Sequence, residues 1–510
     1  MTDVTVVGAG HNGLVCAAYL ARAGLSVTVL EASHQAGGAC ITRSFEEGFQ
    51  VSACAHLSQF SQAVASDLNL DTFGLTSAAG NVTDVALSRS GAIRRMDGDC
   101  ASGEDLPETD VAAFAEFHRQ TGQWARRLAE VANRAPPNLT GSDWRDKFTL
   151  ATLGLRMRAL GRQNLRELLR TGASNLYDVL NDTLSDELLK GAVSLDGVLG
   201  AHMGPRSPTT MLGYLYRRMG GGFQLPAGGT GSITRALASA ATSAGTQIRT
   251  GSRVTRVLIK DHRTVGVVLD DGEVIESDLV VSNADPATTF ELLVGVQHLE
   301  TGFARRVRNH RARGNSAKLH LALDGLPQFT GLNKSDHGAR LLIAPDLDYV
   351  ERAFNPAKYG GYSLDPVMEI TIPTVHDPTL APEGRHVLSA IIQYAPCELK
   401  AGWSSQRAGF EQVVMNTLRQ YAPGIEGQVI ASEMLTAADI EQQFLIRGGH
   451  WHHGELCFDQ FMMNRPVFGA GQYATPLPGL FLCGAGCHPG GGVMGFAGRN
   501  AAREILKAAL

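Results

Sequence analysis

The spacing of apolar positions changes twice within the first thirty-odd residues. Residues 5–7 are a β-branched run typical of a buried strand, and residues 14–23 carry apolar and small side chains at helical spacing. Gly24 ends the helical pattern, and residues 25–30 form a second apolar run of strand length. The pattern predicts a strand, a helix and a second strand in immediate succession.

The turn between the first strand and the helix has the sequence Gly-x-Gly-x-x-Gly. Gly8 lets the chain turn tightly, Gly10 lets it approach a pyrophosphate, and Gly13 lets the helix pack closely on the strand. Glu31 closes the second strand at the separation of about 20 residues at which an acid accepts hydrogen bonds from an adenosine ribose. A glycine turn in an unrelated α/β unit is the alternative, but strand, helix and acid together favour a dinucleotide site.

A double glycine, Gly37 and Gly38, follows this unit. It lets the chain fold back over the dinucleotide, as in flavoproteins that bury FAD along its length, and this favours FAD over NAD. The sequence has no second strand, Gly-x-Gly-x-x-Gly turn and helix, so a dedicated NAD(P)H domain is not expected. The substrate itself is the expected reductant.

The later hydrophobic patterns predict two interwoven domains. Residues 105–190 are helical in pattern, whereas residues 247–285 and 479–508 carry signals typical of a return to the nucleotide-binding domain. Alternating runs predict strands that form the floor of a substrate domain at residues 316–323, 368–372 and 386–394. We expect an FAD-binding domain of residues 1–100, 221–290 and 425–510, and a substrate-binding domain of residues 101–220 and 291–424.

Composition and charge narrow the function classes. A chain of 510 residues exceeds one simple core, and 44% hydrophobic residues are typical of a globular protein. The net charge of −5 and the lack of a basic tail argue against nucleic acid as a partner. No apolar run approaches the ~20 residues that span a bilayer, and the N-terminus lacks a signal-peptide pattern. We therefore expect a cytoplasmic protein.

The eight cysteines are scattered without a C-x-x-C pair or a paired metal spacing. We expect them to be reduced and mostly structural, and we expect no metal site. The lack of a redox-active cysteine pair also argues against a disulfide reductase.

Residues 144–170 interleave basic side chains with apolar ones. A basic amphipathic helix of this kind can lie on an anionic bilayer, which would suit a lipid-soluble substrate. A helix of the substrate domain with a solvated arginine face is the alternative. Peripheral membrane contact therefore stays open at this point.

Several stretches together resemble one known family. They read VVGAGHNGLVCAAYLARAGLSVTVLEA, PAGGTGSITRALA, VVSNADP and GLFLCGAGCHPGGGVMGFAGRNAA. They resemble the phytoene desaturase-like FAD oxidoreductases, and GGHWHHGELCFDQFMMNRP is most similar to the branch of pyridine-nucleotide-disulphide-oxidoreductase-domain proteins and desaturase-like carotenoid ketolases. The resemblance implies an α/β fold similar to the monoamine oxidase and phytoene desaturase group, with a discontinuous Rossmann-type FAD-binding domain interwoven with an α+β substrate domain.

The resemblance also implies cofactor contacts beyond the glycines and Glu31 already named. Val254 would meet the adenine through its backbone, and Gly484 and Ala485 would lie along the ribityl chain. The helix starting near Val493 and Met494 would point its N-terminus at the flavin N1–C2=O edge, where a reduced flavin carries negative charge.

The densest cluster of titratable side chains is residues 448–455, which family motifs place near the flavin. His453 and Glu455 match the family pattern and are candidate catalytic residues, with His453 polarising substrate or flavin. His56 lies in another flavin-proximal motif and is a candidate substrate contact. The alternative for each is a structural side chain. Adjacent His452 and His453 on extended backbone would point to opposite faces, which argues against a metal site.

The expected activity is FAD-dependent hydride abstraction from a small, largely apolar substrate, by desaturation or oxidation of a carotenoid-, isoprenoid- or lipid-like compound. Oxygen or a quinone-like acceptor would reoxidise the flavin. The alternatives are amine oxidase-like oxidation of a C–N bond, a redox-neutral flavin-dependent isomerase and a non-catalytic flavoprotein scaffold. No lysine occurs in the terminal or His-rich motifs, which disfavours amine oxidation. The oligomeric state stays open.

Overall fold

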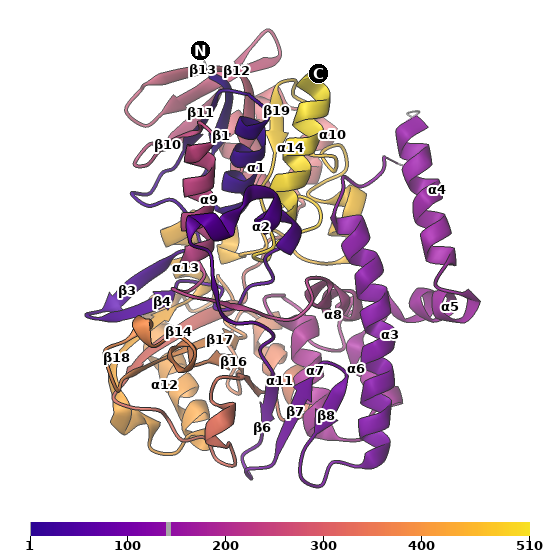
Figure 1. Ribbon diagram of the computed structural model, residues 1–510, viewed down its shortest axis with the longest axis vertical. Coiled ribbons are helices and arrows are strands. Elements are labelled where there is room, and N and C mark those ends of the chain that lie inside the picture. Colours follow the sequence, from indigo (N-terminus) through magenta and orange to yellow (C-terminus); the bar gives the residue numbers. More distant parts are fainter. Residues whose placement is uncertain (1, 139–143, 510) are drawn as a thin grey trace.

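The computed structural model describes residues 2–138 and 144–509, and its first sheet joins strands from distant parts of the chain (Figure 1). The order β10 (Gln247–Arg249), β2 (Val27–Leu30), β1 (Thr2–Val7), β13 (Val274–Ser282) is parallel throughout, and β19 (Leu480–Leu482) pairs in parallel with the end of β13. An antiparallel hairpin of β11 (Val254–Lys260) and β12 (Arg263–Leu269) pairs with the start of β13.

Three helices from three separate segments pack together beside this sheet. Helix α1 (His11–Arg22) contacts both α9 (Gly231–Ser243) and α14 (Phe496–Ala509). Val4 and Val6 of β1 and Leu14 of α1 are fully buried, so the apolar runs of the N-terminal unit form the core here. The predicted discontinuous, Rossmann-type α/β domain is confirmed.

The second sheet has eight strands and is mostly antiparallel. Strand β14 (Ser316–Leu323) pairs along its full length with β17 (His386–Gln393), so the strands predicted from alternating patterns in this region are confirmed. The order of the sheet is β18 (Val429–Leu435), β14, β17, β16 (Val367–Thr371), β15 (Arg340–Ile343), β6 (Asp84–Leu87), β7 (Ile93–Asp97) and β8 (Cys100–Ser102).

Two segments of the second sheet come from ranges that the sequence assigned to the FAD-binding domain. Strands β6 to β8 lie within or next to residues 1–100, and β18 lies within residues 425–510. Strand β6 pairs with β15, and β18 pairs with β14, each far away in sequence. The choice of sheet depends on these distant partners and not on local pattern, so the boundaries at 100 and 425 do not follow the sheets.

A helical layer covers one side of the second sheet, as predicted for residues 105–190 (Figure 1). Phe117 of α3 (Glu108–Ala132) stacks on Tyr214 of α8 (Thr210–Met219) with ring centroids 5.6 Å apart, and α7 (Glu187–Val198) packs on α8. Helices α4 (Trp144–Arg158) and α5 (Arg162–Thr171) project from the side of the molecule (Figure 1). No helix in the described ranges is long and apolar enough to cross a membrane. Helix α6 (Leu176–Thr183) contacts α3, α7 and α8 and completes the layer.

Shorter elements complete the chain. Two small two-stranded sheets connect the domains: β3 (Thr42–Glu46) with β4 (Phe49–Ser52), and β5 (Ser77–Ala79) with β9 (Leu225–Pro226). The remaining helices are α2 (Gln62–Leu68), α10 (Thr301–Arg308), α11 (Leu347–Lys358), α12 (Trp403–Tyr421) and α13 (Ala437–Phe444).

Candidate active site

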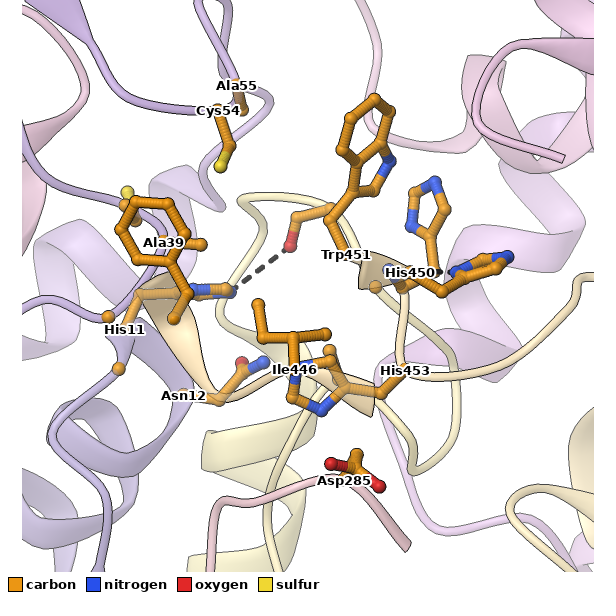
Figure 2. Close-up of a pocket in the computed structure, with 18 of the residues that line it drawn as sticks. His11, Asn12, Ala39, Cys54, Ala55, Asp285, Ile446, His450, Trp451 and His453 are labelled. Carbon is orange, nitrogen blue, oxygen red and sulfur yellow. Dashed lines mark hydrogen bonds between the residues drawn. The ribbon is translucent and has the colours of Figure 1, made fainter. Parts of the chain in front are cut away.

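A cavity of about 900 Å³ is lined by residues of both large sheets and of the helical layer. The first turn of α1 contributes His11 and Asn12 to one wall. Residues 448–455, called the His-rich loop below, contribute His450, Trp451 and His453 to the opposite wall (Figure 2). Both of these walls come from ranges predicted for the FAD-binding domain, whereas other lining residues, such as Leu199 and Ile391, come from ranges predicted for the substrate-binding domain.

The glycines of the first turn leave room that any side chain would fill. A Cβ at Gly13 would lie 2.3 Å from the carbonyl oxygen of Gly8, so only glycine lets α1 approach β1 this closely. A Cβ at Gly10 would lie 2.7 Å from Nδ2 of Asn283, and one at Gly38 would lie 3.3 Å from Cα of Gly10. The two glycine turns therefore meet as an open, backbone-walled cradle, which fits a dinucleotide pyrophosphate.

Glu31 and the start of α1 face the same cavity. Helix α1 begins after Gly10 without a side-chain cap and without an acid in its first turn, so its first N–H groups are free for an anionic group. Glu31 accepts hydrogen bonds from the backbone N–H groups of Ala9 at 2.8 Å and Ser33 at 2.9 Å, one at each oxygen. Its carboxylate is thus held at the edge of the cradle, where an adenosine ribose would lie.

The predicted cofactor residues divide into those that line the cavity and those that lie behind its lining. Gly8, Gly10, Glu31, Gly37, Gly38, Val254, Ala485, Val493 and Met494 line the cavity. Gly13 and Gly484 lie behind the lining, where Gly13 permits the contact of helix and strand and a Cβ at Gly484 would lie 2.6 Å from the carbonyl oxygen of Asn283. Helix α14 begins at Phe496, a little after the predicted start near Val493.

His453 faces the cavity from a strained backbone position. Its φ of 54° is in the left-handed region, and its Nδ1 is buried with no hydrogen-bond partner in the described chain. The ring lies above Asp285 (Figure 2). Burial lowers the pKa of His453, the carboxylate of Asp285 opposes this shift, and the charge of Arg465 adds to it. His453 is therefore a neutral imidazole, able to accept a proton from a group in the cavity.

His450 and His452 line the same wall and are also neutral. Burial lowers the pKa of His450 to about 4, and it lowers the pKa of His452 well below its usual value. Within the described ranges, no group of three or more His, Cys, Asp or Glu side chains has the geometry of a metal site. The histidines of the His-rich loop are thus uncharged hydrogen-bonding groups.

Glu455 does not reach the cavity. It is absent from the lining, and its two carboxylate oxygens accept hydrogen bonds from Nε of Arg311 at 3.0 Å and Nε of Arg313 at 2.7 Å. Burial pushes its pKa upward, but the two arginines outweigh burial and hold the pKa below its usual value. This geometry favours a structural role that anchors the His-rich loop, in place of the catalytic role expected for Glu455.

His56 lines the cavity, but both of its ring nitrogens are occupied. Nε2 lies 3.0 Å from Oε1 of Glu369, and Nδ1 lies 2.7 Å from Nζ of Lys318. Glu369 can only accept, so Nε2 carries the hydrogen and Nδ1 accepts from Lys318. Burial and the charge of Lys318 lower the pKa of His56 to about 4, and burial lowers the pKa of Lys318 to about 7. His56 therefore has no free nitrogen for a substrate.

Glu369 joins His56 to a buried network of charges. Its Oε2 pairs with Nε of Arg340 at 2.5 Å and with Arg217, and Nε of Arg217 lies 2.9 Å from Asp196. Arg340 also pairs with Asp196 and, at 3.1 Å, with Asp84. The network ties β6, β15 and β16 of the second sheet to helices α7 and α8.

Glu369→Gln is expected to destabilise the protein by about 3–5 kcal/mol, because the buried charges of Arg217 and Arg340 lose their shared carboxylate. Glu273→Gln, which removes an ion pair with Arg249 on the surface, is the control and is expected to unfold close to the temperature of wild type. Thermal unfolding of both variants tests this. Equal losses in the two variants would contradict it.

Sequence reasoning missed Lys318, Asn283, His11 and Arg465. Lys318 lies in β14, distant in sequence from the other site motifs, and Asn283 packs against the glycine turn from a motif, VVSNADP, that the sequence did mark. His11 donates a hydrogen bond from Nε2 to the carbonyl of Gly492 at 3.1 Å (Figure 2). This bond connects α1 to residues 479–495, the terminal glycine segment. His11, Asn283 and Arg465 lie within motifs that the sequence marked, but nothing in those motifs singled out these three side chains.

Comparisons with known proteins agree with this site. Residues 206–506 match the family described as flavin containing amine oxidoreductase, and residues 6–68 match the NAD(P)-binding Rossmann-like domain. The chain is 33% identical to pyridine nucleotide-disulfide oxidoreductase domain-containing protein 2 of Mus musculus, over 99% of this chain and 93% of that protein.

More distant relatives also span the whole chain. A limonene dehydrogenase subunit of Castellaniella defragrans is 25% identical, covering 99% of this chain and 94% of the relative. Phytoene desaturase (lycopene-forming) of Pseudescherichia vulneris is 25% identical, covering 97% and 96%. A crystal structure of an oxidoreductase from Methanosarcina mazei shares the fold with a TM-score of 0.60 at 19% identity, covering 99% of this chain and 100% of that one.

The predicted resemblance and the predicted cofactor are both confirmed by these matches. The glycine cradle, Glu31 and the terminal glycine segment are the residues that fit FAD in this structure. The chain belongs to the family of flavin containing amine oxidoreductases and is an FAD-dependent oxidoreductase.

Proposed function

We propose that this protein oxidises a largely apolar substrate, forming a C=C bond or an oxidised carbon. The observation that carries the proposal is the lining of the cavity beyond the glycine cradle. There, apolar side chains come from the helical layer, the second sheet and the loops: Leu57, Leu199, Met203, Phe223, Ile391, Trp451 and Leu456. Such a surface binds hydrocarbon by excluding water from it.

Three of the charged groups of the lining are paired within the protein, which supports the same substrate class. Asp196, Arg217 and Glu369 reach the cavity, but they pair with one another or with Arg340. Their charges are satisfied within the protein, so an ionic substrate would find no free partner among them. An apolar substrate would leave these pairs undisturbed.

The cavity also reaches the surface through apolar side chains. Leu292 and Leu445 line it and are 65% and 45% exposed, respectively. Exposed large apolar residues at an opening give an apolar substrate a favourable path from solvent. Among the relatives, limonene dehydrogenase and phytoene desaturase act on substrates that are hydrocarbons, which favours the same class for this chain.

Bound FAD supplies the chemistry by accepting a hydride from a substrate carbon. The protein then has to align that C–H bond and take the accompanying proton. The apolar wall aligns the substrate. His453, neutral and with an unpartnered nitrogen, accepts the proton, and Asp285 stabilises the resulting imidazolium. Oxygen or a quinone-like compound is the proposed electron acceptor.

Oxidation of a C–N bond is the second candidate function. The observation that favours it is Lys318, a fully buried lysine one hydrogen bond behind His56 of the cavity wall. Product analysis separates the candidates after incubation with isoprenoid hydrocarbons, fatty acyl compounds and amines. Desaturation removes two hydrogens from a hydrocarbon or acyl chain, whereas amine oxidation releases an amine or ammonia. Isomerisation leaves the mass unchanged, and a scaffold converts nothing; either result would overturn the proposal.

We also propose peripheral contact with an anionic membrane through the α4–α5 arm, defined as residues 144–171. Trp144, Phe148, Leu155 and Leu169 of the arm are 69%, 67%, 69% and 73% exposed. Exposed basic side chains accompany them: Lys147, Arg158, Arg162, Arg166 and Arg170. Apolar insertion together with positive charge is the chemistry that recognises an anionic lipid surface.

The wild-type protein is expected to co-sediment with phosphatidylglycerol vesicles at low salt and to be released as salt screens the arginines. Trp144→Ser combined with Phe148→Ser is expected to remain largely in the supernatant, because the apolar anchors are lost. Tyr359→Ser, which alters an exposed aromatic of another region, is the control and is expected to sediment like wild type. No pelleting of the wild type at low salt would refute membrane contact.

A further inference from the structure

Arg465 is a fully buried arginine with no acidic partner in the described chain. It donates instead to six main-chain carbonyls, those of His452 at 2.6 Å, Glu455 at 2.9 Å, Ala485 at 3.1 Å, and Gly454, Gln460 and Cys487 at 3.3 Å each. Buried charges are normally paired with an opposite charge. Arg465 therefore places an uncompensated positive charge inside the protein.

The carbonyls bonded by Arg465 place this charge directly behind the cavity wall. Five of them belong to the His-rich loop and to the terminal glycine segment, and His452 and Ala485 of these segments line the cavity. The two acids closest in sequence are already paired elsewhere: Asp459 with Arg311, and Glu455 with Arg311 and Arg313. The field of the guanidinium thus acts on the cavity through a buried medium that screens it weakly.

The charge of Arg465 contributes to the lowered pKa values of neighbouring histidines. After burial, Arg465 is among the causes that lower the pKa values of His310, His450, His452, His453 and His488. These histidines are therefore neutral and supply no positive charge of their own. A guanidinium remains protonated at any physiological pH, so Arg465 is a fixed cation behind this wall.

We propose that Arg465 is a positioning residue whose fixed positive charge favours the reduced, anionic form of FAD over the oxidised form and so raises the midpoint potential of the bound cofactor. A reduced flavin gains negative charge, whereas an oxidised flavin is neutral, so a nearby cation stabilises the two forms unequally. The six hydrogen bonds hold the guanidinium in place and also hold the two lining segments together. This inference rests on FAD binding and not on the identity of the substrate.

The midpoint potential of the holoprotein, measured by anaerobic reductive titration against reference dyes, tests the charge. Arg465→Gln is expected to weaken the preference for reduced FAD at least tenfold, which is a fall of ~30 mV for a two-electron couple. Arg465→Lys keeps the charge and is expected to stay within threefold of wild type. Arg94→Gln, which changes a buried arginine outside the cavity lining, is the control for general damage.

A second pair of variants covers the case in which Arg465→Gln fails to retain FAD. Cys487 is buried next to Arg465 and accepts through its carbonyl. Cys487→Asp adds a carboxylate that neutralises the guanidinium without removing it, and it is expected to lower the midpoint potential like Arg465→Gln; Cys487→Ser is the neutral control. An unchanged potential in Cys487→Asp, or a shift in Arg465→Lys as large as that in Arg465→Gln, would overturn the proposal.

Discussion

Gly13→Ala is expected to yield a protein that contains almost no FAD and unfolds at a lower temperature than wild type. The added Cβ would lie 2.3 Å from the carbonyl oxygen of Gly8 and 3.1 Å from Cγ of Asn283. The carbonyl is backbone and cannot rotate away, so α1 has to move from β1, at a cost of about 1–3 kcal/mol or more. The same movement opens the cradle between Gly10 and Gly38 that holds the pyrophosphate.

The ratio of flavin absorbance to protein and a thermal melt of the purified variant measure both effects. Gly80→Ala is the matched control, because a Cβ at Gly80 meets nothing within 4 Å. The control is expected to keep the FAD content of wild type. A Gly13→Ala protein with full FAD content would show that the glycine turn does not hold the cofactor.

His453→Asn is expected to lower kcat by about 10²-fold, the low end of what general acid–base catalysis contributes. Asparagine tolerates the left-handed backbone of this position, where φ is 54°, so the loop keeps its shape while the proton acceptor is lost. The rate of flavin reduction in single-turnover mixing, with the substrate that reduces FAD, measures the effect. His488→Asn, at a buried histidine outside the lining, is the control.

The pH profile gives a second readout for His453. Burial lowers its pKa, so the imidazole is unprotonated at neutral pH and becomes protonated only as the pH falls through that lowered value. The rate of flavin reduction in wild type is therefore expected to fall on the acid side, and this acid limb is expected to vanish in His453→Asn. A variant with the wild-type rate and the wild-type acid limb would exclude His453 as the proton acceptor.

The parts of the fold that the sequence predicted depend on local spacing. Strand β1, the glycine turn, α1 and β2 follow one another within a short stretch, and each has its own pattern in β-branched, glycine or helical residues. Strand β14 has the predicted bounds because its eight residues alternate between apolar and small or polar side chains. The role of Gly37 and Gly38 could also be predicted from local spacing, because a double glycine directly after the acid lets the chain fold back over a dinucleotide.

The parts that the sequence could not predict depend on distant pairs. Glu455 looked catalytic from its neighbours, but the arginines that occupy it, Arg311 and Arg313, approach from a segment more than a hundred residues away. His56 likewise meets Glu369 and Lys318 only through the fold. Periodicity reports which face of an element is buried, and it does not report which charged side chain another element brings to that face.

The most direct test of the central claim is an anaerobic titration of the purified holoprotein with isoprenoid hydrocarbons, fatty acyl compounds and amines, followed through the visible absorption of oxidised FAD. We predict that this absorption bleaches stoichiometrically with an apolar hydrocarbon or acyl compound and is unaffected by amines. Bleaching by amines alone would contradict the proposed substrate class. Bound FAD that no compound of the three classes bleaches would contradict the proposed oxidation.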